Sequence, residues 1–110
     1  MNQIRVYIAS PYSIGNKERN VVKSLEMADK LMDLGYNPYV PLLKHFQNKL
    51  FPRNESDWIK DDDVWLASCD IVFRMPGESK GADNEESLAR CLGKPVCRSI
   101  KELDTHKLKE

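Results

Sequence analysis

The chain has 110 residues, of which 31% are charged and 41% hydrophobic, and its 17 basic and 17 acidic side chains leave no net charge. A chain of this length builds one hydrophobic core, so we expect a single domain over residues 1–110. The even charge balance gives no basic surface for a nucleic acid, and no stretch approaches the roughly 18 apolar residues of a membrane span. We therefore expect a cytoplasmic protein without a nucleic-acid or membrane partner.

The cysteines point to free thiols rather than to a metal site. Cys69, Cys91 and Cys97 are odd in number and form no CxxC pair. A zinc site needs a closer cluster of cysteine and histidine. We expect three buried, unpaired thiols and no metal.

The first half of the chain predicts two strands around a long helix. Residues 4–9 (IRVYIA) are rich in β-branched and aromatic side chains and predict a strand that stops at Ser10. Residues 16–34 carry apolar side chains at helical spacing and end at Gly35, and residues 37–40 predict a short second strand. Residues 42–56 lack a period and predict an irregular segment.

The second half repeats the alternation of helix and strand. We predict a helix over 55–68, a strand over 70–75, a loop over 76–81, a helix over 82–92, a strand over 95–99 and a short, fraying helix over 100–110. This order is typical of a flavodoxin-like three-layer α/β sandwich with a parallel sheet of four or five strands. Ligands bind such sheets beyond the carboxyl ends of the strands, which directs attention to loops 10–17, 41–56 and 76–81.

Glu85 is the carboxylate that surface solvation explains least. Counting back three residues from Leu88 and seven from Leu92 places it on the apolar face of its helix. Glu86 falls on the outer face, four residues before Arg90, with which it can pair. Glu85 also lies near the helix start, where the backbone dipole favours an anion.

Asp62 lies inside an apolar stripe of the helix before the third strand. It follows Trp58 by four residues and precedes Trp65 by three, whereas Asp61 and Asp63 flank the stripe and should be solvated. A carboxylate among two indoles is costly to bury unpaired. Asp62 and Glu85 also fit plain structural roles, as a solvated acidic run or a helix-start anion. Their shared position beside the third strand favours a functional site.

Several familiar sites are absent from the sequence. No GxGxxG follows the first strand and no GxxxxGK[ST] occurs, so we expect no dinucleotide or P-loop cofactor. Neither His45 nor His106 has the pattern of a catalytic triad. For His45 a surface or packing role is favoured over a ligand contact.

Three runs in order, residues 6–12 (VYIASPY), 62–70 (DDVWLASCD) and 79–85 (SKGADNE), resemble the nucleoside 2-deoxyribosyltransferase-like family. Within it the chain is closer to the small branch of nucleoside 5′-monophosphate N-glycosidases. The resemblance extends from the first strand to the fourth. It implies an enzyme that cleaves the N-glycosidic bond of a nucleotide, works as a homodimer and needs no cofactor.

The resemblance implies roles residue by residue. Glu85 matches the nucleophile that attacks the anomeric carbon, Tyr7 the tyrosine that positions it, and Asp62 the aspartate near the sugar hydroxyls and the leaving base. Ser79 matches the serine that binds a 5′-phosphate, where the free-nucleoside transferases carry an acidic residue. Tyr7 also fits a buried core position.

The chemistry and position of other residues suggest further substrate contacts. Gly81 offers a free amide to a phosphate, and Ser10 and Arg19 flank the loop after the first strand. Phe46 and Trp58 can stack the base. The loop lacks the glycine pair and arginine of the better-known hydrolases, and Asp70, which matches a family aspartate, is favoured as a turn-shaping residue.

The chemistry leaves other outcomes open. A second base that binds before water would make the protein a base-exchanging transferase. A domain of this fold can also bind nucleotides without turnover, and the same carboxylates could cleave a nicotinamide dinucleotide.

Overall fold

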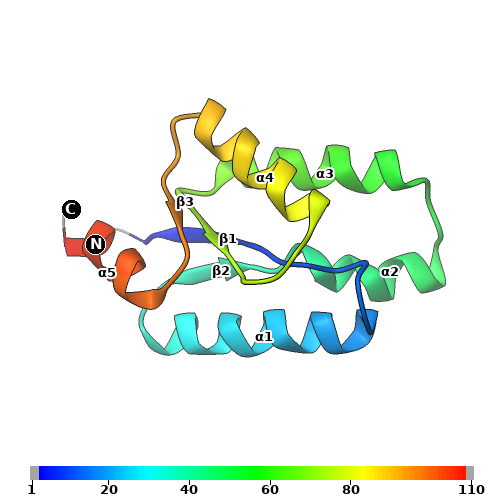
Figure 1. The fold of residues 1–110 in the computed structure, drawn as a ribbon, viewed down its shortest axis with the longest axis horizontal. Helices are drawn as coiled ribbons and strands as arrows, with labels where there is room; N and C mark the ends of the chain where they lie inside the picture. The colour runs from blue at the N-terminus through cyan, green and yellow to red at the C-terminus, as the bar shows by residue number, and fades with distance from the viewer. Residues whose placement is uncertain (1–2, 109–110) are drawn as a thin grey trace.

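The computed structural model describes residues 3–108 as a parallel sheet between two layers of helices (Figure 1). The strands are β1 (Arg5–Ala9), β2 (Asn37–Tyr39), β3 (Ile71–Arg74) and β4 (Val96–Cys97). The helices are α1 (Lys17–Asp33), α2 (Lys44–Leu50), α3 (Glu55–Ser68), α4 (Lys80–Cys91) and α5 (Ile100–Leu108), and a 3-10 turn, η1 (Pro41–Leu43), joins β2 to α2. This is the predicted flavodoxin-like architecture, with four strands in the described part of the chain.

The order of the strands creates a crevice at one edge of the sheet. The order is β2-β1-β3-β4, all parallel, and Val6 of β1 lies opposite both Pro38 of β2 and Ile71 of β3. The chain leaves β1 toward one face and β3 toward the other. Such a reversal between neighbouring strands opens a crevice beyond their carboxyl ends, where α/β proteins bind ligands.

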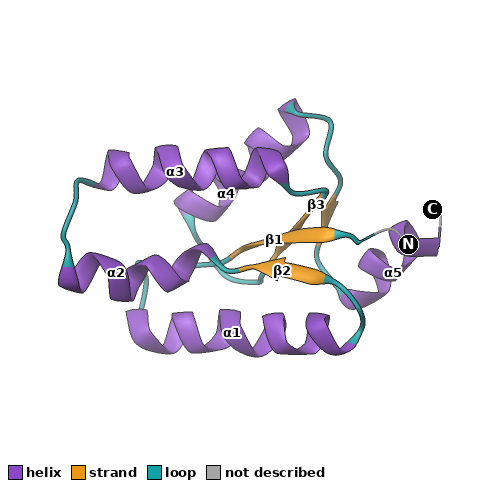
Figure 2. Ribbon diagram, turned by 180° about the vertical axis from the view of Figure 1, so that it is seen from behind, coloured by secondary structure: helices purple, strands orange, loops and turns teal. Residues whose placement is uncertain are grey.

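Alternate side chains of β1 enter two separate cores. Val6 and Ile8 pack against α1 and α5 with Leu31 and Leu103. Tyr7 points to the opposite face, which α3 and α4 cover, and is fully buried there. Figure 2 shows α3 and α4 on one side of the strands and α1 on the other. A tyrosine hydroxyl is thereby placed among helices that carry the acidic residues.

The ends of α1 follow ordinary capping rules. The side chain of Asn16 accepts a hydrogen bond from the Arg19 amide at 2.9 Å, and Gly35, at φ 92°, ends the helix in a conformation that glycine adopts readily. The strong apolar period and these caps explain why this helix was predictable.

The prediction of an irregular segment over 42–56 was wrong. Its first half is helical, as η1 and α2. Leu43, Phe46 and Leu50 are between 47% and 75% exposed, so α2 buries no continuous apolar stripe and leaves no period in the sequence. Polar contacts of Lys44 and His45 attach it to the body of the protein instead.

Three smaller expectations also changed. Cys69 and Cys97 are buried free thiols as predicted, but Cys91 is exposed, because it lies on the outer face of α4. The fourth strand shortens to Val96–Cys97. The final helix is anchored rather than frayed over its described length, since Leu103 is fully buried in the core, and residues 109 and 110 lie outside the described residues.

Candidate functional site

Tyr7 and Glu85 meet on the α3–α4 side of the sheet. The Tyr7 hydroxyl donates a short hydrogen bond to Oε2 of Glu85. Tyr7 comes from the central strand, and Glu85 from the second turn of α4, on the inward face that the spacing predicted. The phenol is therefore not only a core side chain: its one polar atom is directed at a carboxylate.

Burial sets the charge state of Glu85. The pKa of its carboxyl is raised from 4.5 to about 7. Desolvation is the largest cause, the charges of Asp62 and Asp63 act in the same direction, and the hydrogen bond from Tyr7 opposes them. Burial and the neighbouring carboxylates also raise the pKa of Tyr7, which keeps the phenol a donor. At neutral pH Glu85 is divided between its acid and its carboxylate, a condition suited to a nucleophile or a base.

The next residue on α4 behaves in the opposite way. Glu86 was expected on the outer face, and its predicted pair with Arg90 is present at 2.8 Å. Its side chain is only 15% exposed, because Arg98 also contacts it at 2.6 Å. The hydrogen bond from Arg90, with the charge of Arg98, holds the pKa of Glu86 below its ordinary value. The pKa values of these two adjacent glutamates are therefore shifted in opposite directions, upward for Glu85 and downward for Glu86.

Asp62 is paired with a lysine that the sequence did not point to. Its carboxyl is 20% exposed and lies 2.5 Å from the Nζ atom of Lys44, which contacts Asp61 at the same distance. Burial raises the pKa of Asp62, and the Lys44 ammonium opposes that rise. Lys44 was missed because it begins α2, a helix without a sequence period.

An aromatic stack runs from Tyr7 to the surface. Tyr39 lies on Tyr7 with ring centroids 5.7 Å apart, and Trp65 lies on Tyr39 at 5.3 Å. The Trp65 ring is at the outer end, since the residue is 47% exposed. The stacked rings form an apolar surface beside the carboxylates, and the outermost ring, Trp65, is partly exposed to solvent.

Arg74 fixes the loop between β3 and α4. The residue is 4% exposed, and its guanidinium donates to the carbonyls of Met75 and Gly77 and to Oδ1 of Asp83. Its Nε atom lies 3.9 Å from Glu86. An arginine at the end of a buried strand, as in DIVFRM, was the available clue to this role. The contacts hold the start of α4, and with it Glu85, against the sheet edge.

Ser79 and Gly81 lie at the start of α4. Ser79 is the N-cap, and its Oγ accepts a hydrogen bond from the Ala82 amide at 3.1 Å. A Cβ atom at Gly81 would lie 4.0 Å from that oxygen. The Ser79 hydroxyl therefore has a structural task, while its hydrogen can still be donated to a ligand.

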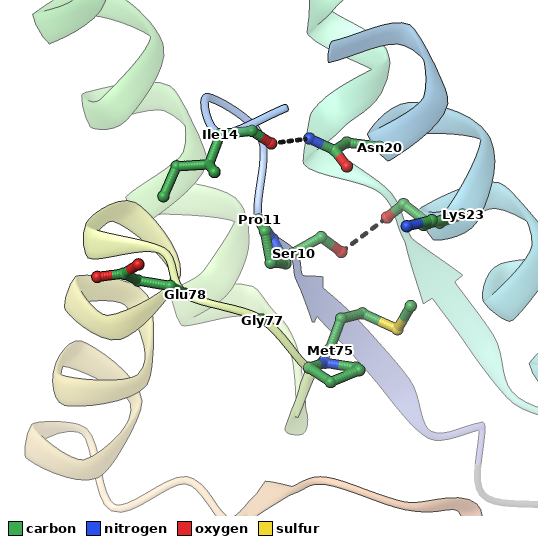
Figure 3. Close-up of a pocket in the computed structure, with 10 residues that line it drawn as sticks. Ser10, Pro11, Ile14, Asn20, Lys23, Met75, Gly77 and Glu78 are labelled. Carbon is green, nitrogen blue, oxygen red and sulfur yellow. Dashed lines mark hydrogen bonds between the residues drawn. The ribbon is translucent and has the colours of Figure 1, made fainter. Parts of the chain in front are cut away.

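Ser10 lines a cavity of about 250 Å³ beyond the carboxyl ends of β1 and β3. It is buried on the α1 side, where its Oγ lies 2.9 Å from Oγ of Ser24. Figure 3 shows Lys23 of α1 and Glu78 of the β3–α4 loop on opposite sides of this cavity. The cavity thus lies at the same sheet edge as the Tyr7–Glu85 pair, but on the other face.

Phe46 and Trp58, the aromatic candidates, make contacts around α2. Phe46 is 47% exposed and meets the His45 ring edge-on at 5.1 Å. Trp58 donates from Nε1 to Oδ1 of Asn48 at 2.8 Å. Trp65, which in the sequence only forms part of an apolar stripe, is instead the aromatic ring joined to Tyr7 through the stack.

The remaining polar candidates have local roles. Arg19 lies exposed in the first turn of α1, where its amide is used by the helix cap. Asp70 accepts a hydrogen bond from the Arg5 amide at 2.8 Å, at the amino end of β3 and thus away from the crevice. His45 contacts the hydroxyl of Tyr12 through Nδ1, and its Nε2 lies 3.8 Å from Glu18.

Two other kinds of site can be checked over the described residues. Within residues 3–108, no three His, Cys, Asp or Glu side chains are arranged to hold a metal ion. No helix in that range is long and apolar enough to cross a bilayer.

Comparison with known proteins identifies the fold. The sequence matches no protein-family model and no curated protein. Among solved structures, a 2-deoxyribosyltransferase of the psychrotolerant bacterium Bacillus psychrosaccharolyticus is similar, with a TM-score of 0.58 and 24% identity over 84% of this chain and 69% of that chain. The chain has a 2-deoxyribosyltransferase fold. The three sequence runs lie on β1, α3 and α4 of this fold and in the residues that follow β1 and α3.

Proposed function

We propose that the protein cleaves the N-glycosidic bond of a nucleoside 5′-monophosphate, with Glu85 as the nucleophile. The observation that supports this most is the hydrogen bond from Tyr7 to Glu85 in a buried, apolar site. A desolvated carboxylate directed by one donor is suited to stabilise or capture the positive charge that develops on a sugar. The similar solved enzyme is named for the transfer of a deoxyribosyl group.

The reaction proceeds in two steps. An oxygen of the Glu85 carboxylate bonds to the anomeric carbon as the carbon–nitrogen bond breaks. The electron pair of the broken bond passes to the base. The carboxyl of Asp62 gives its proton to a nitrogen of that base. Water then loses a proton to Asp62 and attacks the same carbon, which releases Glu85 and the sugar phosphate.

The substrate's two ends have different candidate contacts. Ser79 and the amides at the start of α4 are offered to the 5′-phosphate, where the helix dipole favours an anion. Gly81 offers a backbone amide at this helix start, and Ser10 borders the cavity on the other face of the same sheet edge. The base is assigned to the aromatic surface, with Trp65 added to Phe46 and Trp58 as candidates.

A second copy of the chain is part of the proposal. The family resemblance implies a homodimer, and the exposed Trp65 and Phe46 rings leave the base side of the site open to cover by a partner. Light scattering on the eluting protein would measure the mass of the species in solution.

The test is a chromatographic screen of ribo- and deoxyribonucleoside monophosphates and free nucleosides, with and without a second free base. Release of base from monophosphates supports the hydrolase, and formation of a new nucleotide moves the assignment to a transferase. Tight binding without product, unchanged by Glu85→Gln, would replace the enzyme with a nucleotide-binding module. A fluorescent dinucleotide in the same panel detects cleavage of a nicotinamide dinucleotide.

A further inference from the structure

Lys44 reaches the acidic residues of α3 from the first position of α2. Its Nζ atom lies 2.5 Å from Oδ2 of Asp61 and 2.5 Å from Oδ1 of Asp62, and its side chain is 15% exposed. The ammonium also lies 5.8 Å from the centre of the Tyr39 ring, which stacks on Tyr7. A covered lysine with three such contacts is held in one orientation, unlike a mobile surface ion pair.

The two carboxylates do not depend on the lysine equally. The Asp61 side chain is 52% exposed and is solvated by water, whereas the Asp62 side chain is 20% exposed. A carboxylate taken out of water needs a partner far more than one that remains in it. The contact with Asp62 is therefore the consequential one, and Asp61 competes for the same ammonium from the solvent side.

Apart from Lys44, the titratable groups around Asp62 are neutral or acidic. The titratable side chains that influence it or are influenced by it are Tyr7 on β1, Tyr39 on β2, Lys44 on α2, Asp61 and Asp63 on α3, and Glu85 on α4. Lys44 supplies the positive charge in this set. Burial raises the pKa of Asp62, Lys44 lowers it, and the two neighbouring aspartates raise it.

We propose that Lys44 is a positioning residue that directs the proton of Asp62 toward the departing base and sets the pH at which that proton is available. An ammonium group only donates hydrogen bonds, and the oxygen that it contacts, Oδ1, accepts more strongly when it carries no proton. The contact therefore favours protonation of the other oxygen, Oδ2. The inference rests on the proposed function, in which Asp62 is the acid.

The sign of the effect follows from the charges. The ammonium favours the ionised form of Asp62, so its removal raises the pKa of this carboxyl. Removal of Asp61 acts in the reverse direction, because one negative neighbour disappears and Lys44 is left to Asp62 alone. Shifts of opposite sign from two contacting residues distinguish this arrangement from a general loosening of the fold.

The experiment is a carboxyl-carbon NMR titration of Asp62 in the full chain without substrate. We expect a higher pKa of Asp62 in Lys44→Met and a lower one in Asp61→Asn. Lys49→Met is the matched control, since Lys49 is also a lysine of α2 but pairs with Glu18 of α1, and it should leave Asp62 unchanged. If Lys44→Met unfolds, Lys44→Gln, which removes the charge and keeps a hydrogen-bond donor, gives the same test of the lysine.

Activity gives the second readout. The alkaline limb of base release, which reports loss of the Asp62 proton, should move to higher pH in Lys44→Met and stay in place in Lys49→Met. An Asp62 that titrates alike in Lys44→Met and Lys49→Met overturns the role of Lys44 even if the enzyme turns over normally. Absence of turnover in the unaltered protein overturns the proposed function instead. The NMR titration then still shows whether Lys44 sets the pKa of Asp62.

Discussion

The Tyr7 hydroxyl donates its hydrogen bond to Oε2 of Glu85, a residue 78 positions away in the chain. The bond joins the central strand of the sheet to the second turn of α4. Because strand and helix are both fixed by packing, the carboxylate has little freedom to rotate. Pre-organisation of this kind is what a nucleophile needs, since the reacting oxygen must be in place before the sugar binds.

Tyr7→Phe should slow the reaction and move its pH dependence. The hydrogen bond stabilises ionised Glu85, so its loss raises the pKa of that carboxyl above about 7 and shifts the acid limb to higher pH. At pH 7 we expect kcat/KM to fall about tenfold, from the loss of one hydrogen bond to a charged group. The measurement is a pH–rate profile. Tyr36→Phe, which removes a hydroxyl bonded to Asp104, should leave the profile unchanged, and an unmoved acid limb in Tyr7→Phe would refute the coupling.

Glu85→Gln should stabilise the protein in alkaline solution. The folded pKa of about 7 exceeds the ordinary 4.5, so the folded state is favoured by protonated Glu85 and loses stability as pH rises from 4.5 through 7. Glutamine keeps an oxygen to accept from Tyr7 and never ionises. We expect the variant to match the native protein at pH 4 and to exceed it at pH 8 by on the order of 1–3 kcal/mol. Urea unfolding at both pH values measures the free energy of unfolding of the two proteins. Equal stability at pH 8 would show that ionisation of Glu85 does not destabilise the folded state.

The helices with a clear apolar period were predictable, and the polar contacts between elements were not. Glu85 was placed correctly on the inward face of α4, because Leu88 and Ala89 fix that face. Leu92 shared the same spacing yet is 47% exposed, since it lies beyond the end of α4. Spacing gives the face of a helix but not the extent of the surface that covers it.

Lys44 and Arg74 show why part of the site was missed. Lys44 acts through two aspartates on another helix, and α2 itself has no apolar stripe to reveal it. Arg74 donates to backbone carbonyls of its own loop and to Asp83, and its place at the end of a buried strand does not by itself reveal these partners. Both depend on tertiary geometry, whereas Glu85 and Asp62 stood out because a carboxylate interrupts an apolar pattern.

Ser79 allows the phosphate contact to be separated from the helix cap. Asp is as good an N-cap as Ser, so Ser79→Asp should keep the stability of α4, whereas Ser79→Ala should cost about 1 kcal/mol. The added anion should repel a 5′-phosphate and reduce the preference for monophosphate over free nucleoside at least about tenfold. Comparison of kcat/KM for the two substrates measures it. An unchanged preference in Ser79→Asp would place the phosphate elsewhere.

The stacking surface can be located with three alanine substitutions. If the base lies on the outer end of the aromatic stack, Trp65→Ala should weaken binding of every base alike, by about 1 kcal/mol or more. Phe46→Ala and Trp58→Ala test the two rings proposed from the sequence in the same way. Calorimetric Kd values for a panel of monophosphates compare the three. A ring whose removal changes no Kd is not the stacking partner.

Base release by Glu85→Gln and Glu86→Gln tests the central claim most directly. The two glutamates are adjacent on α4, but Glu85 faces Tyr7 and Glu86 is held by Arg90 and Arg98. Initial rates on the monophosphates that the unaltered protein cleaves should fall at least about a thousandfold in Glu85→Gln and remain within a few-fold in Glu86→Gln. Equal rates in the two variants would contradict a nucleophilic role for Glu85 and, with it, the proposed mechanism.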